Sequence, residues 1–307
     1  MKTMSRRLVL THIPLAALLY LVLFAPKGRP GIASDAALLA ALALFEGLFL
    51  LSVWRKRRAG PALTAPFDIM TIVWSLLFLW ELMTSVLNRA HPVLIPAPEN
   101  VFHTFRVQWS MMLQNILYSL QLLVIGFFAG LILAVVLGLI AGWYPRLRAF
   151  AYPIANVLAP IPAVVFSPYL VALMPTFRSA SVLVIVLGVF WPNFLTTVNR
   201  VVGIEPQILD SARMLCPSNR TMLWHILLPY LFPGVVSGLR VSLTTSLLML
   251  NFAELMGATR GMGFYVQNSI AYANYAHAIA GIIVIGVVVT ALSALVACLQ
   301  KHLVRWH

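Results

Sequence analysis

The strongest constraint on this chain is a succession of long apolar segments in which polar and apolar residues do not alternate. A helix of about 20 apolar residues crosses the roughly 30 Å hydrocarbon core of a bilayer, whereas the strands of a membrane barrel alternate over about 10 residues. With 61% hydrophobic and only 9% charged residues, the 307-residue chain cannot bury its apolar surface in one water-soluble core. We therefore predict an all-α integral membrane protein.

Proline, glycine and charged residues separate the apolar segments and define eight predicted transmembrane helices. They cover residues 8–24, 36–54, 67–87, 113–142, 150–174, 180–202, 226–250 and 277–299. The first apolar run is longer than the 7 to 15 or so residues of a signal peptide core, which favours a retained signal anchor. The first two helices would then form a hairpin in an N-terminal extension, residues 1–66, ahead of a six-helix body in residues 67–307.

Lysine and arginine are unevenly distributed over the segments that flank the predicted helices. The excess, including the run Arg55–Arg58, lies on segments that share one side with the N-terminus. Because cytoplasmic flanks carry this excess, we predict a multi-pass protein with both termini in the cytoplasm, and the segment 203–229 on the same side. Topology also explains the net charge of +13, so we expect no nucleic-acid partner. Cys216 and Cys298 would face a reducing compartment, and we expect no disulfide.

Residues 205–229 stand out as a polar, helix-compatible segment in an apolar chain. Glu205-Pro206 favours a helix start, since proline is tolerated in the first turn and an acid there complements the helix dipole. The small residues Ser211 and Ala212 would let another protein approach closely. Four apolar residues would anchor the helix against the membrane helices: Ile208, Leu209, Met214 and Leu215.

A break and a second helix are predicted next. Cys216-Pro217 interrupts the first helix, and Ser218 or Asn219 could cap a second short helix that includes Arg220 and Trp224. The result would be a helix-turn-helix across the cytoplasmic ends of the membrane helices. It would either contact a soluble partner or lie at the membrane surface as an ordinary amphipathic loop.

The spacing within this segment is specific. Asp210-Ser-Ala, three residues, Cys216, nine residues and Ile226-x-Leu228-Pro229 resembles the EAA loop of ABC importer permeases, E-A-A-x3-G-x9-I-x-L-P. From about Leu79 onward the chain is similar to the nitrate, sulfonate and taurine branch of that family. The matching motifs, in order, are Trp80-Glu81, Ile95-Pro-Ala-Pro98, Ala159-Pro-Ile-Pro162 with Pro168, and Ala253-Glu-Leu-Met-Gly-Ala258 with Gly261-Met-Gly263.

The resemblance implies a type I permease core in a bacterial inner membrane. It implies a permease subunit of an ATP-driven importer for a small solute, either a nitrate-, sulfonate- or taurine-like anion or a small heterocycle. The implied partners are two ABC ATPase subunits, a second permease copy in a homodimer, and a periplasmic or lipid-anchored substrate-binding protein. A membrane anchor or sensor that keeps this architecture without transport is the alternative.

In the family, the EAA loop sits in a groove of the ATPase and carries its closure to the pore. The resemblance therefore implies ATPase-coupling residues at Glu205, Asp210, Ser211, Ala212, Cys216, Pro217, Ile226, Leu228 and Pro229. Two of them depart from the family pattern, with Asp210 in place of glutamate and Cys216 in place of glycine. Glycine supplies a positive φ that a Cβ resists, and we expect Pro217 to push Cys216 toward an extended conformation instead.

Catalytic signatures are absent from the sequence. The seven histidines form no H-E-x-x-H pair, and no G-x-x-x-x-G-K-[ST] run binds nucleotide phosphates. We therefore expect no enzyme and no cofactor in this chain, with ATP and Mg bound and hydrolysed by a partner ATPase.

Candidate pathway groups lie in the third to fifth helices of the body. Pro160, Pro162 and Pro168 interrupt helical hydrogen bonding, which is tolerated where irregular backbone borders a cavity or is satisfied by neighbours. We predict that residues 159–168 line the translocation path or its gate. Asn193, Thr197 and Thr244 are polar candidates for the same path, with helix packing as the alternative role.

Three charged residues fall inside predicted helices, where a charge usually faces the bundle interior or water. We expect Glu46 to pack against the body or to reach the membrane surface. For Glu81 and Arg240 we expect a structural polar contact.

Overall fold

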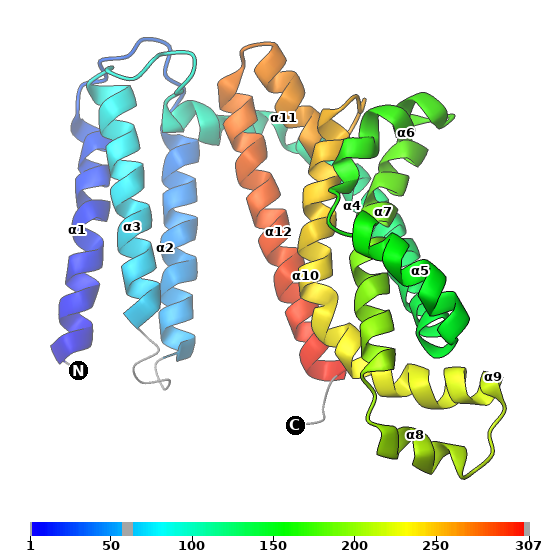
Figure 1. Cartoon of the computed structure of the whole chain (residues 1–307). Coiled ribbons are helices and arrows are strands. Elements are labelled where there is room, and N and C mark those ends of the chain that lie inside the picture. Colours follow the sequence, from blue (N-terminus) through cyan, green and yellow to red (C-terminus); the bar gives the residue numbers. More distant parts are fainter. Residues whose placement is uncertain (1, 57–63, 304–307) are drawn as a thin grey trace. The chain divides into compact units, whose positions relative to one another are not determined.

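The computed structural model describes residues 2–56 and 64–303, and within them every regular element is helical (Figure 1). In chain order the elements are α1 (Lys2–Phe24), α2 (Ala36–Lys56), α3 (Thr64–Glu81), η2 (Leu82–Val86), α4 (Pro98–Trp143), α5 (Pro145–Leu158), η3 (Ala163–Phe166), α6 (Ser167–Leu173), α7 (Phe177–Val202), α8 (Pro206–Arg213), α9 (Asn219–Thr221), η4 (Met222–Leu227), α10 (Leu228–Leu255), α11 (Met262–Ala271) and α12 (Tyr275–Leu303). The basic residues Arg57, Arg58 and Arg305 of the predicted cytoplasmic flanks lie outside the described residues.

The prediction of a helical membrane protein is confirmed. Six helices of the described chain are long and apolar enough to span a bilayer: Ala36–Arg55, Ala65–Val86, Pro98–Trp143, Phe177–Val202, Asn219–Leu255 and Tyr275–His302. A seventh span is possible if the bent pair Pro145–Leu158 and Ala163–Leu173 counts as one, and the shorter apolar helix Leu8–Phe24 corresponds to the first predicted segment. The count of eight stays a prediction.

The chain divides into two compact units, one formed by Met1–Met112 and Val266–Ile283, the other by Leu113–Tyr265 and Val284–His307. In the first unit α3 runs alongside α1 and α2 (Figure 1). The three helices and the start of α4 share one core, in which Leu18, Leu38, Trp74 and Phe102 are buried. The N-terminal hairpin is therefore packed into this unit, and the predicted domain boundary between residues 66 and 67 stays a prediction.

A buried charge cluster joins the loop after α1 to the rest of the first unit. The Lys27 ammonium pairs with Glu81 (3.1 Å from its Oε1), with Glu99 and with Asp35 (3.2 Å). Both glutamates are fully buried, and the Ser85 hydroxyl donates to each of them. The structural polar contact predicted for Glu81 is thus confirmed.

The protonation of Lys27 follows from these contacts. Burial alone would lower the pKa of its ammonium, but the hydrogen bond to Glu99 and the charges of Glu81 and Glu99 raise that pKa above its ordinary value. A raised pKa in the folded state means that the stabilisation is complete below the ordinary lysine pKa and is lost only as pH rises beyond it. Lys27 therefore stays protonated throughout the neutral range.

The same loop holds the segment that precedes α4. Arg29 is buried, and its guanidinium donates to the Asn88 side chain and to the backbone carbonyls of Ala90 and Ile95, at 2.7–3.1 Å. The Ala33 N–H donates to Asn100 Oδ1 at 2.7 Å. Residues 27–33 of the extension thus fix residues 81–100 through charge and hydrogen bonds.

Glu46 has a different partner from the one expected. Its carboxylate lies 2.8 Å from His12 Nε2, so the contact joins α1 and α2 within the hairpin. The expectation that Glu46 packs against the body or reaches the membrane surface is wrong, because an imidazole one helix away is in hydrogen-bonding range.

Glycines set the close packing of α4 against α7 in the second unit. A Cβ at Gly126, Gly130, Gly138 or Gly142 would come within 3.2 Å of atoms of α7. The spacing of four residues within each pair is the small-xxx-small pattern that lets membrane helices approach. α10 completes this core with Leu243, Leu247 and Leu250, against which side chains of α12 pack.

Candidate functional site

The first helix of the polar segment starts where the sequence predicts. Glu205 is the N-cap residue of α8, with a φ of −57° and a ψ of 132°, and Pro206 occupies the first helical turn. The helix ends at Arg213. Since proline has no N–H to leave unsatisfied, it stabilises this start.

The turn after α8 corrects one expectation. Cys216 has a φ of +45°, so it adopts the left-handed conformation itself and Pro217 does not make it extended. The N–H of Cys216 donates to the carbonyl of Arg213 at 2.8 Å, which closes the turn tightly. The position therefore keeps the geometry that a glycine would adopt, at a cost of about 1–2 kcal/mol for a residue with a Cβ.

The second helix is capped as predicted but does not end as predicted. Ser218 Oγ accepts the Thr221 N–H at 3.2 Å and caps α9. The helix then continues through the π-helical turn η4 into α10 without a break. The expectation of a separate short helix is wrong, because the wider π turn accommodates the change without interrupting the hydrogen-bonded chain.

The inner face of the segment belongs to the core of the second unit. Met222, Leu223 and Leu227 of η4 are buried with Val201 and Ile204. Partly buried residues that pack against this cluster are Leu209 and Ala212 of α8, Ile226, and Leu228. The predicted anchoring role of Leu209 is confirmed. Ala212 also faces this core, so close approach by another protein at this position is not what the structure presents.

The outer face of α8 and its turn is exposed. Met214 is 85% and Leu215 80% exposed, so the expectation that they anchor the segment is wrong. They follow the end of α8, where the chain turns away from the core. Asp210 and Ser211 are exposed as well, and the Asp210 carboxylate pairs with Arg213 at 3.3 Å. Two large apolar side chains beside a charge pair thus form an exposed patch.

Two further contacts hold α8 and α9 near the end of α4. The Arg213 guanidinium lies over the Trp143 ring, 5.9 Å from its centroid, and Trp143 Nε1 donates to Asn219 Oδ1 at 3.4 Å. Together with the shared core, they make the segment a packed unit with one free face. Pro229, predicted with this group, is exposed in the first turn of α10.

The helix break predicted at the proline-rich segment is confirmed. α5 and the η3–α6 helix meet at an angle of 86° across residues 159–162. The side chains of Pro160, Pro162 and Pro168 are exposed. That these residues line a path or gate stays a prediction.

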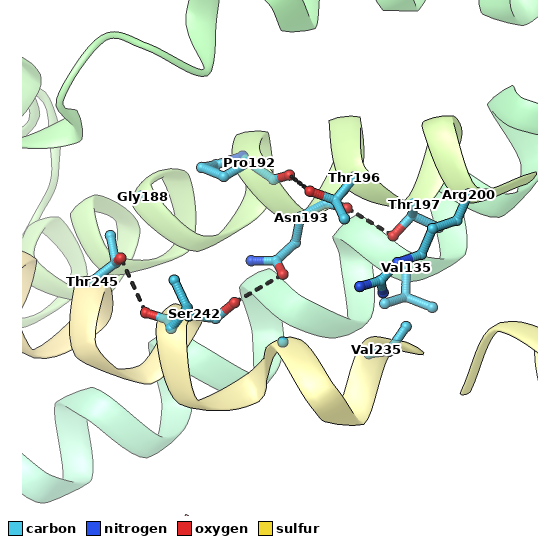
Figure 2. Close-up of a pocket in the computed structure, with 12 residues that line it drawn as sticks. Val135, Gly188, Pro192, Asn193, Thr196, Thr197, Arg200, Val235, Ser242 and Thr245 are labelled. Carbon is cyan, nitrogen blue, oxygen red and sulfur yellow. Dashed lines mark hydrogen bonds between the residues drawn. The ribbon is translucent and has the colours of Figure 1, made fainter. Parts of the chain in front are cut away.

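A cleft of about 170 Å³, lined by both polar and apolar residues, lies between α7 and α10 and is bordered by Val135 of α4 (Figure 2). Asn193 and Thr197, both predicted pathway residues, line it. Thr244 does not, because it is exposed on another face of α10 and donates to the carbonyl of Arg240. Its neighbour Thr245 lines the cleft instead.

Hydrogen bonds order the polar groups of the cleft. The Ser242 hydroxyl donates to Asn193 Oδ1 at 2.9 Å, which connects α10 to α7. Asn193 Nδ2 donates in turn to the carbonyl of Val189 at 2.7 Å. Arg200, the charged residue that lines the cleft, was not predicted from the sequence as a pathway residue. Its spacing from Asn193, seven residues or two helical turns, is the signal that could have placed it on the same face.

The buried carboxylate of Glu254 connects the two parts of a predicted motif, Ala253–Ala258 and Gly261–Gly263. Glu254 accepts hydrogen bonds from the Ser119 hydroxyl at 2.6 Å and from the Gly263 N–H at 2.7 Å. The N–H groups of Gly261 and Met262 donate to Asn115 and Ser119 of α4. A Cβ at Gly261 would overlap this carboxylate, so the glycine is required for the turn.

Comparison with known proteins adds a family match to this geometry. Residues 130–306, more than half of the chain, match the family described as binding-protein-dependent transport system inner membrane component. Over 261 residues the chain is 27% identical to the taurine transport system permease protein TauC of Escherichia coli, covering 83% of this chain and 92% of TauC.

Two other relatives differ in the solute that they are named for. The nitrate import permease protein NrtB of Leptolyngbya laminosa is 27% identical over 186 residues, 61% of this chain and 67% of NrtB. The formylaminopyrimidine transport permease protein ThiX of Halalkalibacterium halodurans is 22% identical over 191 residues, 62% of this chain and 76% of ThiX.

Proposed function

The chain belongs to the binding-protein-dependent transport system inner membrane component family and is a permease subunit of an ABC importer, and from this premise we propose its substrate, its partners and the segment that couples it to the ATPase. The substrate is a small solute, either a nitrate-, sulfonate- or taurine-like anion or a small heterocycle. The named solutes of the relatives TauC, NrtB and ThiX support this range. They are transport proteins, so a non-transporting anchor or sensor is not favoured.

The partners follow from the family. Two ABC ATPase subunits bind ATP and Mg and hydrolyse the nucleotide, and a periplasmic or lipid-anchored binding protein delivers the solute. Two copies of this chain form the pore as a homodimer in the bacterial inner membrane. Both termini and residues 203–229 face the cytoplasm, as the distribution of lysine and arginine supports.

Residues 205–229 couple the ATPase to the pore. The observation that carries this assignment is the division of the segment into a packed face and a free face. Leu209 and η4 share a core with the end of α7, whereas Met214 and Leu215 are exposed. A displacement imposed on the free face would therefore move α7 and α10 together, because close-packed side chains transmit movement and deform little.

The roles within the segment divide accordingly. Asp210 and Ser211, with Met214 and Leu215, contact the ATPase groove. Ala212, Ile226 and Leu228 hold the segment against the permease. Cys216 and Pro217 set the turn between the two faces, and Glu205 and Pro229 stand where its helices begin.

The test replaces the free face and leaves the packed one intact. In the variant Met214→Glu/Leu215→Glu we expect the permease to insert and to lose most of its co-purifying ATPase, because two apolar contacts become charged. ATP-driven uptake in proteoliposomes should fall at least about 10-fold, the effect of losing about 1.4 kcal/mol of docking energy.

The matched control is Tyr272→Gln, an exposed aromatic residue after α11 that the assignment does not use. It should retain both the ATPase and uptake. Normal ATPase recovery and uptake in Met214→Glu/Leu215→Glu would contradict the coupling role of this segment.

A further inference from the structure

The cleft between α7 and α10 contains one charged side chain among its twelve lining residues, Arg200, and no acidic one. Its other polar residues are uncharged: Asn193, Thr196, Thr197, Ser242 and Thr245. Figure 2 shows them along the facing surfaces of the two helices, with Arg200 at one end. The cleft is thus polarised, with positive charge at one end and hydroxyl and amide groups along its length.

The guanidinium of Arg200 is directed across the cleft toward α10. A Cβ on Gly234 would lie 3.2 Å from Arg200 Cζ and 3.3 Å from Nε and Nη1, and a Cβ on Gly238 would lie 4.0 Å from Nη2. Gly234 and Gly238 are one helical turn apart, so α10 presents bare backbone where the guanidinium lies. A Cβ at Gly234 would make this contact tighter than is usual, so the arginine side chain would have to shift by a few tenths of an ångström.

Arg200 has no carboxylate partner in the described chain. The ion pairs of residues 8–55 and 65–302 involve His12, Lys27 and Arg213 on the basic side. A half-buried guanidinium carries five N–H donors in a planar fork that matches an oxyanion, and a charge within a membrane helix faces an aqueous cavity or a counter-ion. Its positive charge is therefore not neutralised by any carboxylate of the described chain and is available to a ligand in the cleft.

We propose that this cleft binds the anionic group of a small solute, and that Arg200 recognises it. The ligand class is an oxyanion of the size of a sulfonate, a carboxylate or nitrate. The site narrows the proposed substrate range to its anionic members, and in this it rests on the proposed function of the chain as an importer permease.

The end of the cleft away from Arg200 adds a second ligand preference. The Thr245 hydroxyl lies there (Figure 2) and donates to the carbonyl of Val241 at 3.2 Å, which leaves its oxygen lone pairs as acceptors. Oxygens of this kind accept hydrogen bonds. A solute that carries a donor group opposite its anionic group, such as an ammonium, would therefore be held at both ends.

The test is ligand binding to the purified permease–ATPase complex in a detergent without phosphate groups. Methanesulfonate is the probe, and dimethyl sulfone, of similar size but uncharged, is its control. We expect methanesulfonate to raise the thermal unfolding temperature of the wild-type complex in a saturable way and dimethyl sulfone to have no effect.

Variants assign the response to Arg200. In Arg200→Gln the apparent affinity for methanesulfonate should fall about 10-fold or more, and Arg200→Lys should lie between, since it keeps the charge and loses the fork. Arg240→Gln removes an exposed arginine of α10 that does not line the cleft, and should bind like the wild type. If Arg200→Gln fails to assemble, the comparison of Arg200→Lys with the wild type decides.

Three outcomes would overturn the proposal. They are equal responses to methanesulfonate and dimethyl sulfone, unchanged binding in Arg200→Gln, and no response to methanesulfonate but saturable stabilisation by short-chain phosphatidic acid. The last would mean that Arg200 binds lipid phosphate. If the complex couples ATP hydrolysis to uptake but binds no oxyanion, only this binding site is refuted. If the chain never assembles with an ATPase, the proposed function is refuted.

Discussion

Replacing Lys27 by methionine is the most direct test of how the N-terminal extension stabilises the first unit. Lys27 lies 3.1 Å from Glu81 and also pairs with Glu99, and both carboxylates are fully buried. At an effective dielectric constant of about 20, one such pair at this distance attracts by about 5 kcal/mol. The cost of burying the charges and the repulsion between the two glutamates offset part of it.

The loss of stability in Lys27→Met depends on the carboxylates of Glu81 and Glu99, which remain buried. Removing one partner of a buried ion pair costs about 3–5 kcal/mol, because the other charge stays buried without compensation. At roughly 2–4 °C per kcal/mol, the thermal unfolding temperature of Lys27→Met should fall by about 6–20 °C. Unfolding followed in detergent by tryptophan fluorescence or by loss of a monodisperse chromatographic peak measures this change.

Two variants separate charge from packing. Lys27→Met/Glu81→Gln/Glu99→Gln removes all three charges and keeps groups that can accept from Ser85, so most of the lost stability should return. Arg89→Met removes an exposed cation from the same region and should change the unfolding temperature little. An unfolding temperature of Lys27→Met within about 2 °C of the wild type would refute the reasoning, as would a triple variant no more stable than Lys27→Met.

Two other positions give sharp stability predictions by the same assay. Gly261→Ala should lower stability by about 1–3 kcal/mol, since its φ is +118° and the added Cβ would overlap the Glu254 carboxylate, whereas Gly286→Ala, with open space around it, should be neutral or stabilising. Equal effects of the two alanines would count against the Glu254 turn. Cys216→Gly should raise stability by up to about 1 kcal/mol, since φ is +45° there, and a loss of stability would show that the thiol makes contacts that outweigh this strain.

The helices that the sequence predicted well are those specified by local properties. Predicted segments 36–54 and 180–202 lie within two or three residues of α2 and α7, because length and apolar composition are enough to indicate a membrane helix. The start of α8 at Pro206 and the cap at Ser218 were also predictable, since both depend on neighbouring residues only.

The candidate site was predictable as a segment but not face by face. Met214 and Leu215 are apolar, and composition alone suggested that they would be buried. They are exposed because they follow the end of α8, beyond the part of the helix from which Leu209 reaches the core. Thr244 and Thr245 are adjacent and chemically alike, yet only Thr245 lines the cleft, since a step of about 100° around a helix separates them.

The amino-acid sequence by itself determined that this is a helical membrane protein, where its main apolar helices lie, and which segment carries the EAA-like pattern. These properties depend on residues close together in the chain. The tertiary structure decided that Lys27 pairs with Glu81 and Glu99, 54 and 72 residues away, and that Arg200 faces the bare backbone of Gly234 and Gly238. Which charges meet, and which face of a helix is free, depend on how distant helices pack, and no local pattern specifies that.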